Sequence, residues 1–258
     1  PSHNLKYKMS KPIINLYWFK RDLRIIDNVP LQLSCDDEYP TLLFYLFEPI
    51  LLNDLHHSQR HWTFVKESIV DINKSLDKYK TKVHCYELDV ISFLKRVSKY
   101  FTINKIFSHI DTGIGVTYKR DLEVSHFCKK NKINWHEEIR NGVFRGRSNR
   151  INWINDWKNY MEQNIIDLDC DKNDFYNISD KLIKTIEIKP NNDNKFVQKG
   201  GTTEGLKYLK SFLNDRFKSY QNNISKPMKS RTSCSRLSPY FAWGNLSTRY
   251  VWQLAKNE

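Results

Sequence analysis

Two serines frame a short stretch near the end of the chain whose residue types suit phosphate binding. Ser235 and Ser238 flank Arg236 and Leu237, and the residues after them predict the start of a helix. Unpaired backbone N–H groups and the helix dipole both favour negative charge at such a place. The same residues would also suit a helix that is capped by serine and binds nothing, so this short pattern leaves both interpretations open.

A second group of chemically capable residues follows the first apolar run. After residues 13–19, the charges alternate at Arg21, Asp22, Arg24 and Asp27. We interpret these four side chains mainly as a structural ion-pair network, in which they pair with each other and fix the turn into the next helix. Direct contact with a bound ligand is the alternative, because ligands of α/β folds collect where the strands end.

Basic side chains dominate the last quarter of the chain. The whole sequence has a net charge of +13, and residues 195–258 hold twelve Lys and Arg against three Asp and Glu. Net charge alone does not separate a nucleic-acid-binding protein from an ordinary basic one. Six basic residues follow one another with no acidic residue between them: Arg216, Lys218, Lys226, Lys229, Arg231 and Arg236. We expect this run to bind DNA phosphates through Lys226, Lys229 and Arg231, with a solvated surface as the alternative.

Metal and nucleophile chemistry find little support. His57 and His61 have the spacing of a helical metal pair, but no third ligand is in view, so we expect solvated helix histidines and no metal site. Five cysteines, at 35, 85, 128, 170 and 234, are far apart and form no C-x-x-C. We expect all of them to be reduced. No nucleophilic triad is recognisable, and we predict no catalytic residue within these 258 residues.

Strand-length apolar runs alternate with helical patterns through the first 140 residues. Strands are predicted at Ile13–Phe19, Thr41–Phe47, Lys82–Tyr86, Lys105–Ser108 and Asn134–His136. Helices are predicted at Ser58–Lys78, Val90–Tyr100 and Thr117–Lys130. Because parallel strands need helical crossovers, the alternation predicts a doubly wound, Rossmann-like α/β fold with a five-stranded parallel sheet. Such sheets bind ligands at the carboxyl ends of their strands, although the G-x-G-x-x-G of an ordinary dinucleotide site is absent.

The rest of the chain divides into a connector and a helical region. We expect a domain at 1–140, a connector at 141–199 and a helical domain at 200–258. The connector is rich in Asn, Asp and Lys, and we predict that it lies over the first domain, anchored by a helix around Trp153 and Trp157. In the helical region, Ser247 is the predicted N-cap of a helix over Arg249–Ala255.

No run approaches the roughly 18 apolar residues of a membrane helix, and the start lacks a signal-peptide pattern. We therefore expect a soluble, cytoplasmic, monomeric protein. The chain opens on Pro1 and breaks off at Glu258 just after a helical pattern. We expect a fragment whose helical domain is incomplete, because so few helical residues rarely bury enough area to stand alone.

Two long motifs resemble those of the photolyase and cryptochrome family. The stretch W-F-K-R-D-L-R-I-I-D-N at residues 18–28 resembles the family's W-F-R-R-D-L-R-x-x-D-N, with Lys20 in place of the more frequent Arg. The stretch S-R-L-S-P-Y-F-A-W-G-N-L-S at residues 235–247 resembles the signature of the family's flavin-binding domain. Thr112 and Gly113, followed by residues 117–121, also look like a family feature. Two such motifs in the right order are hard to obtain by chance.

The resemblance implies an antenna domain followed by the truncated start of an all-α FAD-binding domain. It also implies that the complete protein binds FAD and uses blue light to reverse pyrimidine dimers in DNA by electron transfer from the reduced flavin. The family's phosphate-binding stretch falls on Cys234, Ser235, Arg236, Leu237 and Ser238, and its tyrosine contact falls on Tyr220. Cys234 stands where Thr is frequent, and a thiol is the weaker hydrogen-bond partner. A second pigment, whether folate, deazaflavin or FMN, would lie at the carboxyl edge of the sheet.

Two rival functions stay open on sequence grounds. A cryptochrome of the same fold would be a blue-light photoreceptor, but the basic last quarter favours repair, since signalling needs no phosphate track. A non-enzymatic nucleotide-binding module would not contain the motif at 235–247. The family's lesion-pocket residues and electron-transfer tryptophans come from later helices, so we expect the 258-residue chain alone to hold FAD poorly and to repair nothing. The sequence does not distinguish cyclobutane from 6-4 lesions.

Overall fold

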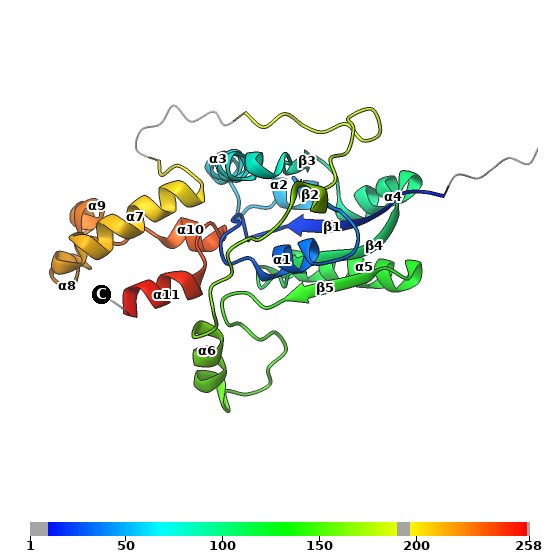
Figure 1. The fold of residues 1–258 in the computed structure, drawn as a ribbon. Helices are drawn as coiled ribbons and strands as arrows, with labels where there is room; N and C mark the ends of the chain where they lie inside the picture. The colour runs from blue at the N-terminus through cyan, green and yellow to red at the C-terminus, as the bar shows by residue number, and fades with distance from the viewer. Residues whose placement is uncertain (1–9, 190–196, 257–258) are drawn as a thin grey trace, which may run out of the picture.

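Five parallel strands form a single sheet (Figure 1). The computed structural model describes residues 10–189 and 197–256; Pro1, Lys195 and Glu258 lie outside the described residues. The strands are β1 Ile13–Phe19, β2 Thr41–Leu46, β3 His84–Tyr86, β4 Thr102–His109 and β5 Asn134–Glu138. Their order across the sheet is β3-β2-β1-β4-β5, and every neighbouring pair is parallel. The predicted doubly wound α/β fold is therefore confirmed.

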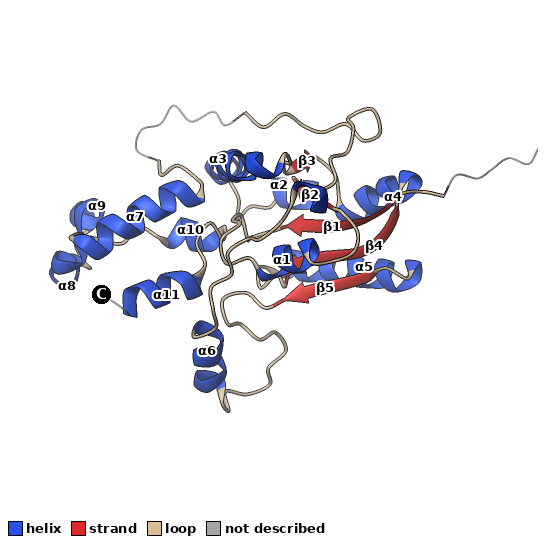
Figure 2. Ribbon diagram, viewed as in Figure 1, coloured by secondary structure: helices blue, strands red, loops and turns tan. Residues whose placement is uncertain are grey.

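Helices cover both faces of the sheet (Figure 2), which explains why β1 and β2 are almost continuously apolar. Along β1, Tyr17 and Phe19 pack into one core cluster, whereas Leu16 and Trp18 pack into the other. The first cluster includes α1 (Val29–Cys35) and α3 (Gln59–Leu76), and the second includes α4 (Val90–Tyr100) and α5 (Gly115–Asn131). The predictions miss α2 (Pro49–Leu52) and give no bounds for α1, because both helices are too short to show a helical period. The predicted helix at Ser58–Lys78 covers α3 and most of the 3-10 turn η1 (Asp77–Tyr79).

The connector runs back along the α/β part, as predicted. It contains α6 (Trp153–Met161) and the short 3-10 turn η2 (Lys172–Asp174). The backbone N–H of Tyr176 donates to the carbonyl of Thr41 at 3.0 Å, and that of Ile186 donates to Cys85 at 2.8 Å. The connector therefore hydrogen-bonds to β2 and β3 and covers part of the core.

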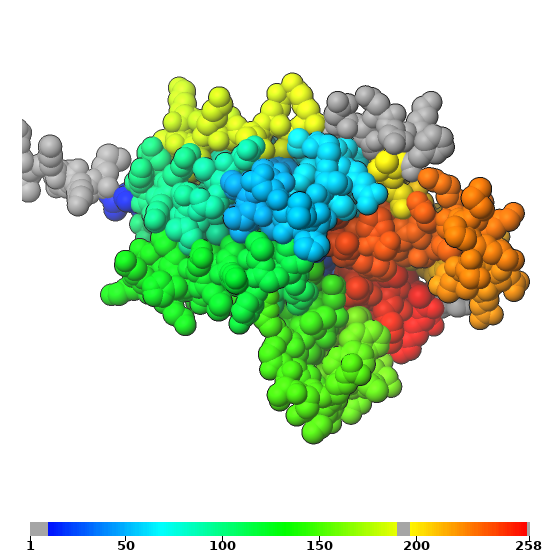
Figure 3. Space-filling model, turned by 180° about the vertical axis from the view of Figure 1, so that it is seen from behind, coloured from blue at the N-terminus to red at the C-terminus, as the bar shows by residue number. Residues whose placement is uncertain are grey.

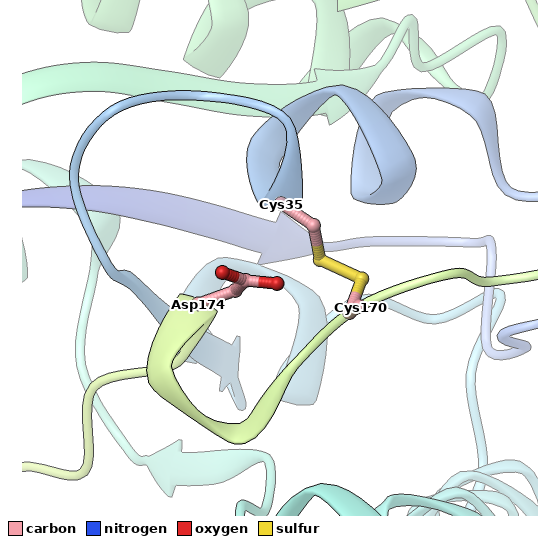
Figure 4. Close-up of side chains that lie close together, drawn as sticks. All are labelled: Cys35, Cys170 and Asp174. Carbon is pink, nitrogen blue, oxygen red and sulfur yellow. A yellow bond between two sulfur atoms is a disulfide. The ribbon is translucent and has the colours of Figure 1, made fainter.

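A disulfide ties the connector to α1, contrary to the prediction that all cysteines are reduced. Cys35 at the end of α1 is bonded to Cys170 in the connector, and the Asp174 carboxylate lies beside the two sulfurs (Figure 4). The two cysteines are 135 positions apart, so only the return of the connector brings them together. The remaining cysteines, Cys85, Cys128 and Cys234, are free thiols.

Residues 202–256 are helical and lie at the edge of the sheet toward which the strands point (Figures 1 and 2). The elements are α7 Thr202–Asn214, η3 Arg216–Ser219, α8 Tyr220–Asn223, η4 Pro227–Lys229, α9 Ser230–Ser233, α10 Ser238–Ala242 and α11 Thr248–Lys256. The predicted cap of the last helix is confirmed, because the Ser247 hydroxyl accepts from the N–H of Tyr250 at 3.3 Å.

A buried ion pair joins this helical region to the α/β part. The Asp27 carboxylate accepts two hydrogen bonds from the Arg249 guanidinium and one from the Ser247 hydroxyl. It also accepts from the backbone N–H of Ile166 in the connector at 3.3 Å. Burial alone would raise the pKa of Asp27, but the hydrogen bonds from Arg249 and Ser247 outweigh it and hold that pKa below its usual range.

The expected ion-pair network within residues 21–27 is therefore wrong in its partners. Asp27 pairs with Arg249, and the Arg24 guanidinium donates to the carbonyl oxygens of Gly244 and Asp27, both at 3.0 Å. Asp22 is buried and accepts from the Tyr17 hydroxyl at 2.5 Å. Most of these partners lie outside the motif, because the turn is buried under another part of the chain and each charge needs a partner from the residues that cover it.

The two signature stretches contact each other through their backbones. The N–H of Leu23 donates to the carbonyl of Trp243 at 3.0 Å, and the side-chain amide of Asn245 donates back to Leu23 at 2.9 Å. Gly244 between them has φ 71°, and an added Cβ would lie 2.1 Å from the carbonyl oxygen of Arg21. Only glycine permits this approach, which explains the W-G-N sequence at the contact.

Asp27→Ala should lower the free energy of unfolding by about 3–5 kcal/mol, because it leaves the buried Arg249 guanidinium unpaired. Urea denaturation followed by circular dichroism measures this. Glu204→Ala is the control: it breaks the exposed Glu204–Lys207 pair and should change stability by less than about 1 kcal/mol. Equal effects of the two substitutions would remove Asp27 from its structural role.

Candidate functional site

A cluster of buried charges lies at the carboxyl edge of the sheet, where the chain leaves β1 and β4 toward helices on opposite faces of the sheet. Its centre is Arg120 on α5, whose guanidinium donates to Glu48 at 2.6 Å, to Asp121 at 2.8 Å and to Asp111 at 3.2 Å. The guanidinium carbon also lies 4.7 Å from the centroid of the Trp18 ring. Arg120 thus connects residues that follow β2 and β4 with a tryptophan of β1.

Lys20, directly after β1, extends the same cluster. Its Nζ lies 3.3 Å from Glu137 and 3.7 Å from Asp121. It also lies 4.9 Å from the Trp18 ring centroid and 5.3 Å from that of Trp135. The lysine that departs from the family motif therefore sits as a compact charge between two indoles and two carboxylates.

Burial and ion pairing shift the pKa values of the carboxyl groups in this cluster in opposite directions. Burial raises the pKa of Glu48 and Glu137, and the neighbouring Arg120 and Lys20 offset the effect only in part. Burial acts in the same direction on Asp111, but Lys20 and Arg120 outweigh it and bring the pKa of Asp111 below its usual value. The cluster is thus a mutually paired network and not a set of free acids or bases.

His57 lies beside this cluster at the carboxyl edge of the sheet, and its exposure differs from the prediction. It precedes α3, and only 5% of its side chain is exposed, so the prediction of a solvated helix histidine is wrong. Its ring centroid lies 5.0 Å from that of Trp62 and 5.9 Å from that of Trp243. Burial, reinforced by the adjacent Arg21, lowers the pKa of His57. The burial of His57 could not be predicted locally, because Trp243 contacts it only in the tertiary structure.

His61 has a capping role. Its Nδ1 accepts from the backbone N–H of Ser58 at 3.0 Å at the start of α3. Its ring lies 6.0 Å from that of His57 and edge-on to it. Because His57 precedes α3, the i, i+4 spacing does not place the two histidines one turn apart on a helix.

The candidate phosphate site at Ser235–Ser238 is a turn followed by a very short helix. Arg236 has φ 62°, in the left-handed region, and Leu237 follows in the right-handed helical region. Among the described residues, no acceptor pairs with the backbone N–H groups of Ser235, Arg236 or Leu237. Successive N–H groups across such a change of hand form a nest that binds anions. Because α10 has only five residues, this nest and not a helix dipole is the feature suited to phosphate.

The predicted flavin-binding residues at and around this nest differ in their exposure and in the hydrogen bonds that they already make. Ser238 is exposed, whereas Leu237 is buried in the core. The N–H of Cys234 donates to the carbonyl of Ser230 at 3.1 Å, so its amide is already used and only the partly buried thiol remains. Arg216 holds the turn by donating to the carbonyl oxygens of Cys234 and Ser235. Sequence reasoning assigned Arg216 to the basic run and missed this supporting role.

Tyr220 lies on α8, beside the arginine-bearing turn η3. Its ring packs edge-on against Phe212 at 5.9 Å between centroids. Tyr220 thus lies on a helix that packs against η3 and α9, and among the described residues it makes no hydrogen bond to the nest.

Lys226, Lys229 and Arg231 lie on one lobe, formed by η3, α8, η4 and α9. All three side chains are exposed. Figure 3 shows this region, coloured orange, at the outer edge of the molecule. We call it the basic lobe. Its cations are thus placed where a large polyanion can reach them.

The comparisons with known proteins identify the family. A family model described as DNA photolyase matches residues 15–145, which is half of the chain. The chain belongs to the DNA photolyase family. The match spans the sheet, the buried charge cluster and the turn that carries Asp27.

Two curated relatives come from different branches of this photolyase family. A deoxyribodipyrimidine photo-lyase of Buchnera aphidicola is 24% identical, aligned with 92% of this chain and 52% of its own length. Cryptochrome-2 of Gallus gallus is 23% identical, aligned with 94% of this chain and 46% of its own. The chain thus spans about half the length of these relatives.

Solved structures show that this fold is that of photolyases. The archaeal photolyase from Sulfolobus tokodaii, described with two FAD molecules, superposes with a TM-score of 0.72 at 18% identity, over 95% of this chain and 55% of that one. A class III photolyase from Agrobacterium tumefaciens gives a TM-score of 0.72 at 16% identity, over 98% and 54%. Of the helices described here, none combines the length and apolar character needed to cross a bilayer.

Proposed function

We propose that the full-length product of this gene is a light-driven flavoprotein that repairs pyrimidine dimers in DNA. The observation that carries the proposal is the nest at Arg236 and Leu237, which lies next to the basic lobe. A phosphate-binding turn beside exposed cations suits a protein that holds a nucleotide cofactor and approaches nucleic acid. We propose the same division as above: an α/β domain at 1–140, a connector at 141–199 and part of an FAD-binding domain at 200–258.

The residues at the nest fit the pyrophosphate of FAD. The N–H groups of Ser235, Arg236 and Leu237 would donate to phosphate oxygens, and the exposed Ser238 hydroxyl could add a further hydrogen bond. Arg216 would hold the turn in place by donating hydrogen bonds to the carbonyl oxygens of Cys234 and Ser235. When bound and reduced, FAD supplies the light-excited electron donor that splitting a dimer requires.

A pair of substitutions at Arg236 separates the backbone nest from the side chain. Arg236→Gly keeps the left-handed conformation, whereas Arg236→Val disfavours it because valine is β-branched. We expect the glycine variant of the full-length protein to retain FAD and the valine variant to lose most of it, measured by flavin absorbance after gel filtration. Equal loss in both variants would instead assign binding to the guanidinium.

The basic lobe supplies the contact with DNA in this proposal. Between Arg216 and Arg236 the sequence has no acidic residue, so successive cations can contact a phosphate backbone, while Asp215 just before this stretch lies 3.9 Å from Lys218. Contacts of this kind give affinity and orientation without reading the base sequence. That suits a repair protein, whose lesion can occur in many sequence contexts.

Reversing Lys226 and Lys229 to Glu should flatten the salt dependence of DNA binding. Loss of two phosphate contacts should change the slope of log K against log salt by about 2. Fluorescence anisotropy with a duplex at several salt concentrations measures it. Lys129→Glu with Lys130→Glu, on exposed positions of α5, is the matched control with the same change in net charge. A slope that responds equally to both pairs would mean that net charge, not the lobe, governs binding.

The match to a cryptochrome makes a photoreceptor the second candidate. The deciding experiment incubates the flavin-loaded full-length protein with dimer-containing duplex under blue light or in darkness, and counts the remaining dimers. We expect loss of dimers only in the light, and none with the flavin-depleted Arg236→Val variant. Flavin-loaded protein that leaves every dimer intact would overturn the repair proposal in favour of the photoreceptor.

A further inference from the structure

The crevice at the carboxyl ends of β1 and β4 is the place where a doubly wound sheet takes a ligand, and where a second pigment is expected. Thirteen residues line it, most of them at or after the ends of β1, β2 and β4, together with Trp243 of the helical region. The cavity that they leave measures about 20 Å³ for water-sized occupants. That is room for roughly one water molecule, whereas pockets for organic ligands measure roughly 300–1,000 Å³.

Side chains of the protein itself fill the missing volume. The Arg120 guanidinium lies over the Trp18 ring and is held there by Glu48 and Asp111. All four side chains are buried. Moving Arg120 aside for a ring system would leave two carboxylates unpaired away from water, which a pigment without a positive charge could not compensate.

The mouth of the crevice is closed by a second layer. The Arg21 guanidinium lies 5.3 Å from the Trp243 ring centroid, and its Nη2 lies 3.4 Å from His57. His57 in turn packs on Trp243. This layer is held in place by the Gly244 contact, because Trp243 precedes the glycine that touches the Arg21 carbonyl.

Carboxylates neutralise two of the three lysine and arginine side chains of the lining, so these two are not available to a pigment phosphate. Arg120 is paired with three carboxylates, and Lys20 with two. Arg21 has no carboxylate partner among the described residues, but Trp243 and His57 hold its guanidinium across the mouth of the crevice. In contrast, Glu48 Oε1 has no hydrogen-bond partner among the described residues, and a single water in the cavity would satisfy it.

We infer that this crevice is sealed by its own ion cluster and takes no second pigment. Side chains occupy the volume that a ring system would need, and the cavity that remains has room for roughly one water molecule. If the proposed function holds, light reaches the repair reaction without an antenna pigment at the sheet edge.

The test uses the full-length protein with its FAD site saturated, titrated with FMN and with a deazaflavin riboside while pigment fluorescence is followed. We expect no saturable binding of either compound at the crevice. Thr117→Phe adds bulk to the lining, and Val116→Phe adds the same bulk at the neighbouring exposed position. Saturable binding that Thr117→Phe abolishes and Val116→Phe preserves would overturn the inference. Binding that survives both substitutions lies elsewhere and supports it.

A second measurement does not depend on how the variants fold. Acid denaturation of the purified protein releases all bound pigments for chromatography, and we expect one equivalent of FAD per chain and no other chromophore. A second pigment equivalent that protects the Trp18 region from hydrogen exchange would refute a sealed crevice. A protein that carries no FAD at all would instead count against the proposed function, while the FMN titration would still test the crevice.

Discussion

The arrangement of the whole chain depends on satisfying one buried carboxylate. Asp27 lies in the turn after β1, and its partners come from the connector and from the start of α11. An ionised carboxylate away from water is tolerated only when nearly every lone pair has a donor. Three segments must therefore meet at one point, which fixes how the helical region is placed against the sheet edge.

The same docking event also shapes the crevice at the sheet edge. Gly244 lets the helical region approach the Arg21 backbone, and that approach carries Trp243 over Arg21 and His57. The interface and the closed crevice are thus two results of one contact. In this chain the edge of the sheet that commonly serves as a ligand site instead contributes to the junction between the two parts.

The fold could be predicted to a large extent from local patterns. The apolar runs that became β1 and β2 are buried on both faces, and the alternation of such runs with helical patterns identified a parallel sheet. The cap at Ser247 was also predictable, because capping depends on neighbours in sequence. In these cases the deciding interactions lie within a few residues of each other.

Interactions between distant residues could not be predicted in the same way. The alternating charges after β1 suggested pairing within the motif, but Asp27 pairs with Arg249 and Arg24 with the Gly244 carbonyl. Likewise, Cys35 and Cys170 meet only because the connector turns back over the sheet. At the phosphate site the residues were named from the family motif, whereas the nest depends on the backbone angles of Arg236, which side-chain patterns do not reveal.

The order of synthesis gives the Asp27 link a further meaning. Asp27 and Arg249 are 222 positions apart, so at roughly 5–20 residues per second the arginine emerges on the order of ten seconds or more after the aspartate. During that interval the strands can pair while the turn after β1 faces water. A turn rich in Asp and Arg is well hydrated in this state, whereas an apolar surface would invite aggregation. The polar turn thus protects the growing chain from aggregation until α11 has been synthesised, and it is buried only when α11 packs against it.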